Sequence, residues 1–236
     1  MKTNWELQLI GEWRLRCGDR YLNVAARQQH LIALLALQGA KPRPYAASLL
    51  WPDSSDAQAS GSLRATILAI SRQLPGLMTT APGRLELAEG TRIDVQELRD
   101  GISQAGLRDR RAMDLLARGE LLPGWYDDWV LAEQEQWRSF RVTTLKTAAA
   151  NRLEHEDAEG ALETARAALQ IDPLDENAIR LVLRAHLAEG NQARALSDYR
   201  DFSSRIRAEL GAALPADITG LIRPLLAPAR VLSCQA

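Results

Sequence analysis

The sequence predicts an α+β domain over residues 1–93, an all-α domain over residues 94–227 and a short tail over residues 228–236. Three observations lead to this division. Apolar and polar residues alternate near the N-terminus, apolar residues then recur at helical spacing, and a pair of residues in the C-terminal half recurs further along the chain. Alternation with a period of two is typical of half-buried strands, and a period of about 34 residues is typical of stacked helix pairs.

Residues 5–24 are expected to form three short strands. The apolar residues that alternate with polar ones are Trp5, Leu7, Leu9, Trp13 and Leu15. Breaks that contain glycine interrupt the alternation, and Gly18 with Asp19 predicts a tight hairpin turn. A third strand follows at residues 21–24.

The apolar period then changes from strand-like to helical. A helix is predicted over residues 26–38, with Gly39 as its C-cap. A short second helix follows Pro44 and stops at Trp51 and Pro52, because proline cannot continue a helix. The strands are therefore followed by two helices of unequal length.

A third helix is predicted over residues 57–74. Ser55 and Gln58 fit a capping box, in which each side chain bonds the backbone of the other residue. The inward stripe of this helix consists of Ala59, Leu63, Ile67, Ile70 and Leu74. Residues 77–87 follow as a hairpin, because the turn at residues 81–84 has proline and glycine at its centre. The order of sheet, helix, short helix, turn, helix and hairpin predicts an N-terminal winged helix-turn-helix.

The rest of the chain is expected to be an all-α, tetratricopeptide-like helical domain. Helices are predicted near residues 95–105, 108–117 and 128–154, and again from Pro215 onward. Ala161 and Leu162 recur as Ala195 and Leu196, and this spacing matches the tetratricopeptide period of about 34 residues. Stacked pairs of this kind bury a continuous core.

Three tryptophans accompany the long helix at residues 128–154. Trp125, Trp129 and Trp137 fall at i, i+4 and i+12, close to one helical face. We expect them to be core residues at the seam between the two domains.

Four short segments resemble those of the antibiotic-regulatory bacterial activators, the SARP family. They are Leu49–Asp53 (LLWPD), Leu121–Trp129 (LLPGWYDDW), Asp172–Glu176 (DPLDE) and Glu209–Gly211 (ELG). The resemblance covers residues 5 to about 225 and implies an OmpR/PhoB-like winged helix joined to a bacterial transcriptional activator domain. It also implies a transcriptional activator that binds double-stranded DNA at direct repeats near a promoter, as more than one protomer, and contacts RNA polymerase.

The outward face of helix 57–74 is the candidate DNA-reading surface, because the second helix of a helix-turn-helix enters the major groove. The outward and flanking residues are Gln58, Gly61, Ser62, Arg64, Ala65, Leu68, Ala69 and Arg72. Glutamine can read adenine, arginine can read guanine or hold phosphate, and alanine or leucine can touch a thymine methyl. Lys41 and Arg43 are candidate backbone contacts, and Arg84 in the hairpin is a candidate for the minor groove.

This outward face departs from the family pattern. Members commonly have a basic residue in the place of Ser71, and polar or basic residues in the places of Leu68 and Ala69. Because phosphate contacts supply most of the salt-dependent affinity, a face with few cations predicts weak binding per protomer. Binding would then depend on a homodimer on DNA or on polymerase. The alternative is a protein-interaction adaptor that uses Ala65, Leu68 and Ala69 to contact another protein and no longer reads DNA.

The charge is distributed unevenly along the chain. The formal net charge is −1, so the chain has no overall basic field. Positions 1–98 hold 11 Lys and Arg against 9 Asp and Glu, which is the sign expected for a DNA-binding head.

No enzyme class is indicated by the sequence. It contains no Walker loop, nucleophile elbow or dinucleotide fingerprint. His30, His155 and His186 have no ligand spacing, and Cys17 and Cys234 support neither a disulfide framework nor a zinc site. We therefore expect no catalytic residue, cofactor or metal. The chain has no apolar run long enough to span a membrane and no signal-peptide core, so we expect a cytoplasmic protein without a membrane partner.

Overall fold

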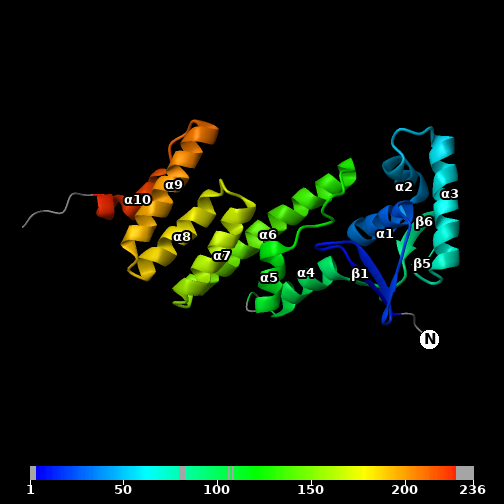
Figure 1. Cartoon of the computed structure of the whole chain (residues 1–236), viewed down its shortest axis with the longest axis horizontal. Coiled ribbons are helices and arrows are strands. Elements are labelled where there is room, and N and C mark those ends of the chain that lie inside the picture. Colours follow the sequence, from blue (N-terminus) through cyan, green and yellow to red (C-terminus); the bar gives the residue numbers. More distant parts are fainter. Residues whose placement is uncertain (1–3, 80–82, 106, 108, 227–236) are drawn as a thin grey trace, which may run out of the picture. The chain divides into compact units, whose positions relative to one another are not determined.

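The computed structural model describes residues 4–79, 83–105, 107 and 109–226. The chain divides into two compact units. The N-terminal unit comprises residues 1–106 and 119–137, and the helical unit comprises residues 107–118 and 138–236. Figure 1 follows their elements along the chain.

The N-terminal unit combines two small sheets with helices. Its strands are β1 (Trp5–Gln8), β2 (Arg14–Cys17), β3 (Arg20–Leu22), β4 (Lys41–Pro42), β5 (Met78–Thr79), β6 (Arg84–Leu87) and β7 (Arg92–Ile93). Its helices are α1 (Ala26–Gln38), α2 (Arg43–Leu50), α3 (Asp56–Gln73), α4 (Asp94–Ala105) and the first part of α6 (Asp128–Glu154). One sheet has the order β3-β2-β1-β7 and the other β4-β6-β5. The predicted α+β winged helix-turn-helix is confirmed.

The first sheet follows the predicted alternation. β1 pairs antiparallel with β2, and Leu7 lies opposite Leu15, so both buried side chains share one face. β2 turns into β3 through a tight loop in which Gly18 takes a φ of 57°. This positive φ explains why glycine stands at the predicted turn.

Helix α1 is the central helix of this unit. Every residue from 31 to 36 is buried, so the helix is apolar around most of its circumference. It ends at Gly39, whose φ of 73° confirms the predicted C-cap. α2 and α3 pack against α1 and against each other.

Two short strands were not predicted. β4 pairs with β6, and β7 pairs in parallel with β1 and leads directly into α4. Residues 119–122 also join this unit, because Gly11 N donates to Glu120 O at 2.7 Å and Leu122 N donates to Leu9 O at 2.9 Å. The sequence predicts a domain boundary between residues 93 and 94, where a strand gives way to a helix. The compact units divide elsewhere, because these long-range hydrogen bonds attach residues 119–122 to the N-terminal unit. The predicted tail over residues 228–236 lies outside the described residues.

Asp94 connects the end of β1 to the start of α4. Its carboxylate accepts hydrogen bonds from the backbone N–H groups of Leu9, Ile10 and Val95, at 2.8–3.0 Å. Burial raises the pKa of Asp94 above its usual value of 3.8, although the three backbone donors act in the opposite direction. The side chain therefore supplies the acceptors that these backbone groups lack elsewhere.

Asp94→Ala should lower the free energy of unfolding by about 1–3 kcal/mol at neutral pH, because backbone donors are left without an acceptor. Because the pKa of Asp94 is raised, its contribution to the free energy of unfolding depends on pH. The folded chain holds this proton more tightly than the unfolded chain, so the contribution of Asp94 is full below the unfolded pKa and declines as pH rises through the folded pKa. Urea unfolding of the unmodified chain and of Asp94→Ala at pH 4 and pH 7 measures the difference in their free energies of unfolding. A difference between the proteins that widens toward pH 7 would contradict this assignment.

The helical unit consists of stacked helices. They are α5 (Arg110–Arg118), the rest of α6, α7 (Ala158–Ile171), α8 (Glu176–Ala188), α9 (Gln192–Leu210) and α10 (Ala216–Leu226). Ala161 of α7 and Ala195 of α9 are both fully buried, as equivalent positions of a repeat should be. Ile218 and Ile222 of α10 close the same apolar core. The predicted tetratricopeptide-like domain is confirmed.

The three tryptophans all belong to the N-terminal unit. Trp129 and Trp137 are buried, and Trp137 Nε1 donates to Gly119 O at 2.8 Å. Trp125 differs from the prediction, because it precedes α6 and is half-buried, with its ring stacked on His30 at 4.1 Å. His30 Nε2 also lies 3.1 Å from Asp127, so this contact ties α1 to the segment before α6.

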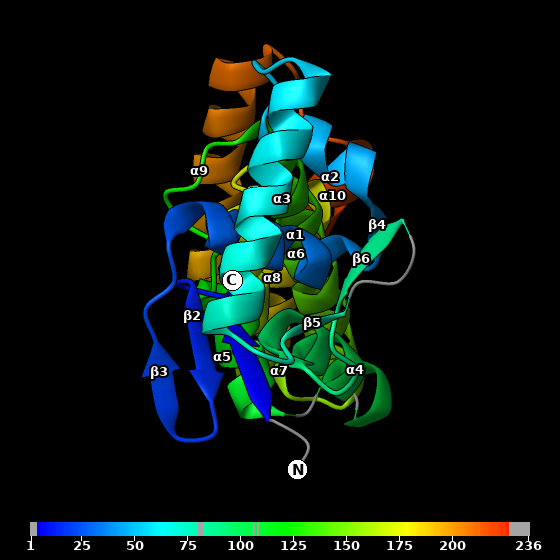
Figure 2. The ribbon, with the colours of Figure 1, turned by 90° about the vertical axis from the view of Figure 1, so that its right-hand side faces the viewer.

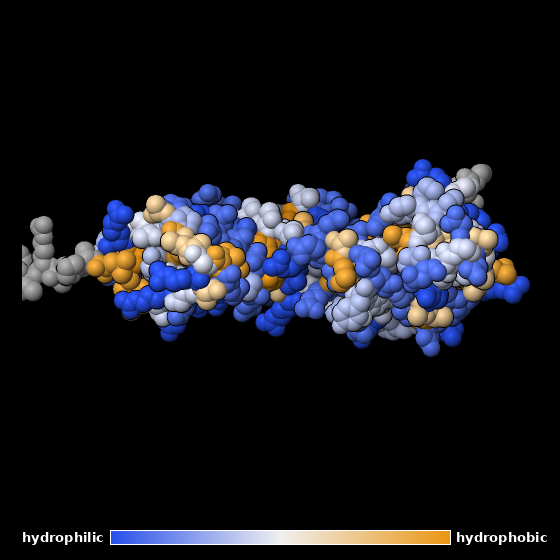
Figure 3. Space-filling view, turned by 90° about the horizontal axis from the view of Figure 1, so that it is seen from above, coloured by the Kyte–Doolittle hydropathy of each residue, from blue (hydrophilic) through white to orange (hydrophobic). Residues whose placement is uncertain are grey.

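The surface is mostly hydrophilic in the view of Figure 3, and apolar side chains form small separate patches there. Within the described ranges, no helix combines the length and apolar character needed to cross a bilayer.

Candidate nucleic-acid interface

Helix α3 is held in place by a cap at its start and a buried stripe along its length. Ser55 Oγ accepts from Gln58 N at 3.4 Å, and Gln58 Oε1 accepts from Ser55 N at 3.2 Å, which confirms the predicted capping box. The stripe residues are buried: Ala59, Leu63, Ile67, Ile70 and Leu74. The opposite face of α3 is therefore free of the core, and Figure 2 shows the helix running lengthwise at the front of this unit.

The structure places the predicted reading residues on this opposite face. The exposed members are Gln58, Arg64, Ala65, Leu68 and Arg72, and the half-buried members are Gly61, Ser62 and Ala69. Leu68 is 52 % exposed, which is high for a leucine. At a rise of about 1.5 Å per residue, Arg64 and Arg72 lie roughly 12 Å apart along the helix axis. The major groove of B-DNA is about 12 Å wide and admits an α-helix, so a helix such as α3 can enter it.

Arg64 and Arg72 are available for binding. Among the described residues, no ion pair or hydrogen bond engages either guanidinium with an acidic side chain. A guanidinium that is not already paired can bond guanine or phosphate without first breaking a contact. Asp56, in the first turn of α3, is the acidic residue of this helix.

Gln58 also caps the start of α3, and this limits how it could contact a base. Its Oε1 accepts from both the backbone N–H and the hydroxyl of Ser55, at 3.2 and 3.0 Å. The bidentate reading of adenine needs the carbonyl oxygen as well as the amide nitrogen of glutamine. Gln58 can therefore donate from Nε2 while capping the helix, but bidentate reading would require it to leave the cap.

The structure brings Lys41, Arg43 and Arg84 together at the second sheet. Pro42 lies opposite Arg84 in the β4–β6 pair, Arg43 N donates to Gly83 O at 3.1 Å, and Arg84 Nη2 donates to the carbonyl of residue 40 at 3.3 Å. The three cations thus come from segments that pair along one side of the hairpin, which Figure 2 shows to the side of α3, although the register puts the side chains of Lys41 and Arg84 on opposite faces of the sheet. We call them the wing cations. The tip of the predicted turn at residues 81–84 lies partly outside the described residues.

Helix α2 contains a residue beside Lys41 that the sequence reasoning missed. Tyr45 is 43 % exposed, and Lys41 Nζ lies 5.4 Å from the centre of its ring. Tyr45 Oη donates to Gln38 Oε1 at 3.2 Å, which fixes the ring over α1. Arg43 is only half-exposed, and its Nε is buried without a partner among the described atoms. No sequence signal marks Tyr45, because its contacts with Gln38 and Lys41 follow from the packing of α2 against α1.

The histidines serve structural contacts. His30 contacts Trp125 and Asp127, and His186 is fully buried with its Nε2 3.0 Å from Asp198. Within the part of the chain that the structure describes, no group of three His, Cys, Asp or Glu side chains could hold a metal ion. Among the described residues, α3 combines outward polar residues with two unpaired arginines, and the wing cations lie at the second sheet.

Comparisons with known proteins agree with this architecture. The family model of the bacterial transcriptional activator domain matches residues 89–226. A solved structure with a similar fold is Mycobacterium tuberculosis EmbR in complex with a low affinity phosphopeptide, with a TM-score of 0.76 and 17% sequence identity. The match covers 95% of this chain and 65% of the EmbR chain, so this chain spans less than two thirds of that protein. No curated protein matches the sequence.

Proposed function

The chain belongs to the family of the bacterial transcriptional activator domain, and we propose that it activates transcription by reading duplex DNA with the outward face of α3. Its winged helix-turn-helix joined to this helical domain is the architecture of a SARP-type activator, and the resemblance found in the sequence is thereby confirmed. The family is one of transcriptional regulators and not an enzyme class.

The observation that carries the proposal is the pair of exposed arginines on the outward face of α3. Arg64 and Arg72 project from a helix whose other side is fixed in the core. In a helix-turn-helix this is the geometry that presents side chains to base edges. The wing cations supply additional positive charge for phosphates, which position a protein on the duplex.

The number of cations bears on how the chain would bind. Few cations on the outward face of α3 predict a modest phosphate contribution for one protomer. Two protomers on direct repeats, together with a contact to RNA polymerase, would raise the overall affinity, because each linked contact increases the effective concentration for the next. We therefore propose that the chain acts in the cytoplasm as more than one protomer at a promoter.

Selection from a pool of random duplexes tests the proposal. The full chain should enrich a shared motif at low salt, and binding to the enriched duplex should weaken steeply as salt rises. The motif should occur as a direct repeat in the best-bound duplexes. No enrichment at low salt, with or without RNA polymerase, would overturn the proposal.

A second function is favoured by one observation, the exposure of Leu68 beside Ala65 on α3. An adaptor would use this apolar face to contact a protein in place of DNA. Such a chain would form a stable complex with a protein partner and would show no salt-dependent affinity for any duplex. The selection experiment therefore separates the two functions.

Arg84→Ala should weaken DNA binding about equally for all duplex sequences. Arg84 is exposed in β6 and belongs to the wing, where a phosphate contact carries no sequence information. Losing one phosphate contact should reduce the slope of log K against log salt by about 1. A titration at four salt concentrations measures this slope. Arg20→Ala on the edge strand β3 is the matched control and should leave the slope unchanged, whereas an equal loss in both variants would remove the role assigned to Arg84.

A further inference from the structure

The outward face of α3 is apolar in its middle. Leu68 is 52 % exposed, Ala65 is exposed beside it, and Ala69 is half-buried. At about 100° per residue, Ala69 lies roughly 40° from Ala65 around the helix, and Leu68 lies roughly 60° from Ala65 on the other side. These three side chains therefore form one small apolar surface, which we call the apolar centre.

Two guanidinium groups flank the apolar centre along the helix. Arg72 is one turn beyond Leu68, about 6 Å further along the axis. On the other side, Arg64 Nη2 lies 3.9 Å from the position that a Cβ on Gly61 would occupy. The Arg64 side chain thus runs back toward the start of α3, and its guanidinium lies beside Gly61, one turn before Ala65. The outward face therefore presents a guanidinium, the apolar centre and a second guanidinium in that order.

The apolar centre has no side-chain atom that can donate or accept a hydrogen bond. In the major groove every base pair presents donors and acceptors, and the C5-methyl of thymine is the apolar group among them. A guanine–cytosine pair placed against Leu68 would leave donors and acceptors buried without partners, which costs free energy. Against thymine, the leucine side chain meets the methyl, and both lose apolar surface to water.

From this arrangement we propose that Leu68 is a specificity-determining residue, which selects a thymine through its methyl group. Guanines contacted by Arg64 and Arg72 lie on the two sides of this thymine in each copy of the repeat. This inference rests on the proposed function, because it names the class of duplex that α3 reads. An adaptor would instead bury the apolar centre against a protein, and the experiment below separates the two.

Base analogues in the selected duplex test the methyl contact. Deoxyuridine differs from thymidine only in lacking the C5-methyl, so each thymidine of the motif is replaced in turn. One position per repeat should lose affinity about fourfold, which is the effect of one apolar carbon no longer removed from water. A cytosine–guanine pair at that position should cost at least fivefold, and 5-methylcytosine there should bind better than cytosine.

Leu68→Ala identifies the partner of the methyl. In this variant the thymidine and deoxyuridine duplexes should bind equally, because the alanine side chain is too short to reach the methyl. Leu68→Met keeps a long apolar side chain and should retain the preference for thymidine. Circular dichroism should show both variants folded, since position 68 lies outside the buried stripe of α3.

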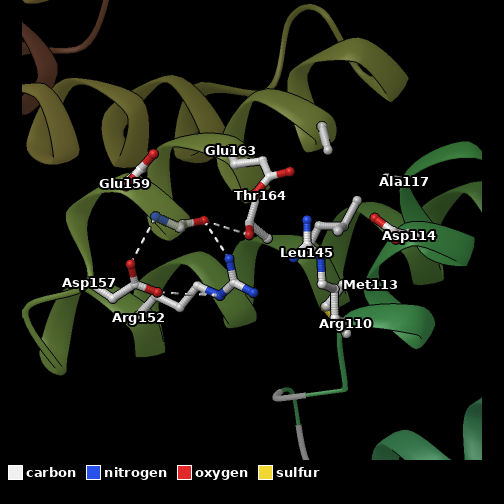
Figure 4. Close-up of a pocket in the computed structure, with 12 residues that line it drawn as sticks. Arg110, Met113, Asp114, Ala117, Leu145, Arg152, Asp157, Glu159, Glu163 and Thr164 are labelled. Carbon is white, nitrogen blue, oxygen red and sulfur yellow. Dashed lines mark hydrogen bonds and ion pairs between the residues drawn. The ribbon is translucent and has the colours of Figure 1, made fainter.

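Leu115→Ala is the matched control, and it should keep the full fourfold preference. Leu115 is 40 % exposed on α5, so this variant also removes an exposed leucine from a helix surface. Figure 4 shows α5 from Arg110 to Ala117, beside the hollow of about 320 Å³ that it forms with α6 and α7 in the helical unit.

The possible failures can be told apart. A selected duplex that tolerates deoxyuridine at every position would overturn this inference and leave the proposed function standing. An equal loss with deoxyuridine in Leu68→Ala and in the unmodified chain would assign the methyl contact to another residue, and this also overturns the inference. If no duplex is selected at all, the proposed function and this inference fail together, and the adaptor is favoured.

Discussion

Replacing Arg64 and Arg72 together by alanine is expected to abolish sequence-specific DNA binding while leaving the fold intact. Each arginine that contacts a base contributes about 1–3 kcal/mol of discrimination, so losing both should lower the affinity for the selected duplex by roughly 100-fold or more. Binding to unrelated duplexes should fall much less, because the wing cations remain. The specific and non-specific affinities should therefore converge.

The fold should survive this double change for a physical reason. Both side chains are exposed, and no ion pair of the described residues depends on them. Alanine also favours helix at least as well as arginine does. Gel-shift titrations with selected and scrambled duplexes measure the effect, and thermal unfolding checks the fold. A double variant that still prefers the selected duplex by the original factor would refute the role of these arginines.

Trp137→Ala is expected to lower the free energy of unfolding by about 3–5 kcal/mol. The Trp137 side chain is 1 % exposed, and Arg99 lies over its ring at 5.9 Å. Its Nε1 also donates to Gly119 O at 2.8 Å, so the change leaves a cavity and an unpaired carbonyl.

Trp137→Phe separates the two contributions. Phenylalanine keeps most of the ring volume and loses the hydrogen bond, so this variant should be clearly more stable than Trp137→Ala. Urea unfolding followed by circular dichroism measures both variants, and the exposed Tyr126→Ala, at 79 % exposure, serves as a control with little effect. A cost below about 1 kcal/mol for Trp137→Ala would show that the burial of this ring contributes little.

The long helices could be predicted from the sequence because their signals are local. α1 and α6 occupy the residues that apolar spacing, Gly39 and the proline positions indicated. The short strands could not be predicted in the same way. β4 and β7 contain two residues each, which is too short to show a period, and they exist because distant segments pair with them.

The candidate site shows the same limit. The outward face of α3 could be predicted from the sequence, because the apolar stripe identifies the side of the helix that packs in the core and the remaining residues must face outward. One feature needed the fold, the grouping of Lys41 with Arg84 through the pairing of two distant segments. Trp125 was expected in a helical face, but its segment precedes α6 and stacks on His30.

The central claim is that the outward face of α3 contacts bases, and a photo-crosslink tests it most directly. A benzoylphenylalanine placed at Leu68, which is 52 % exposed on this face, should crosslink on irradiation to the selected duplex at a base within the shared motif. The same group at Leu210, exposed at the end of α9, should give no crosslink to the motif. If position 68 crosslinks only to a protein, or if the duplex binds without any crosslink to position 68, α3 does not read DNA.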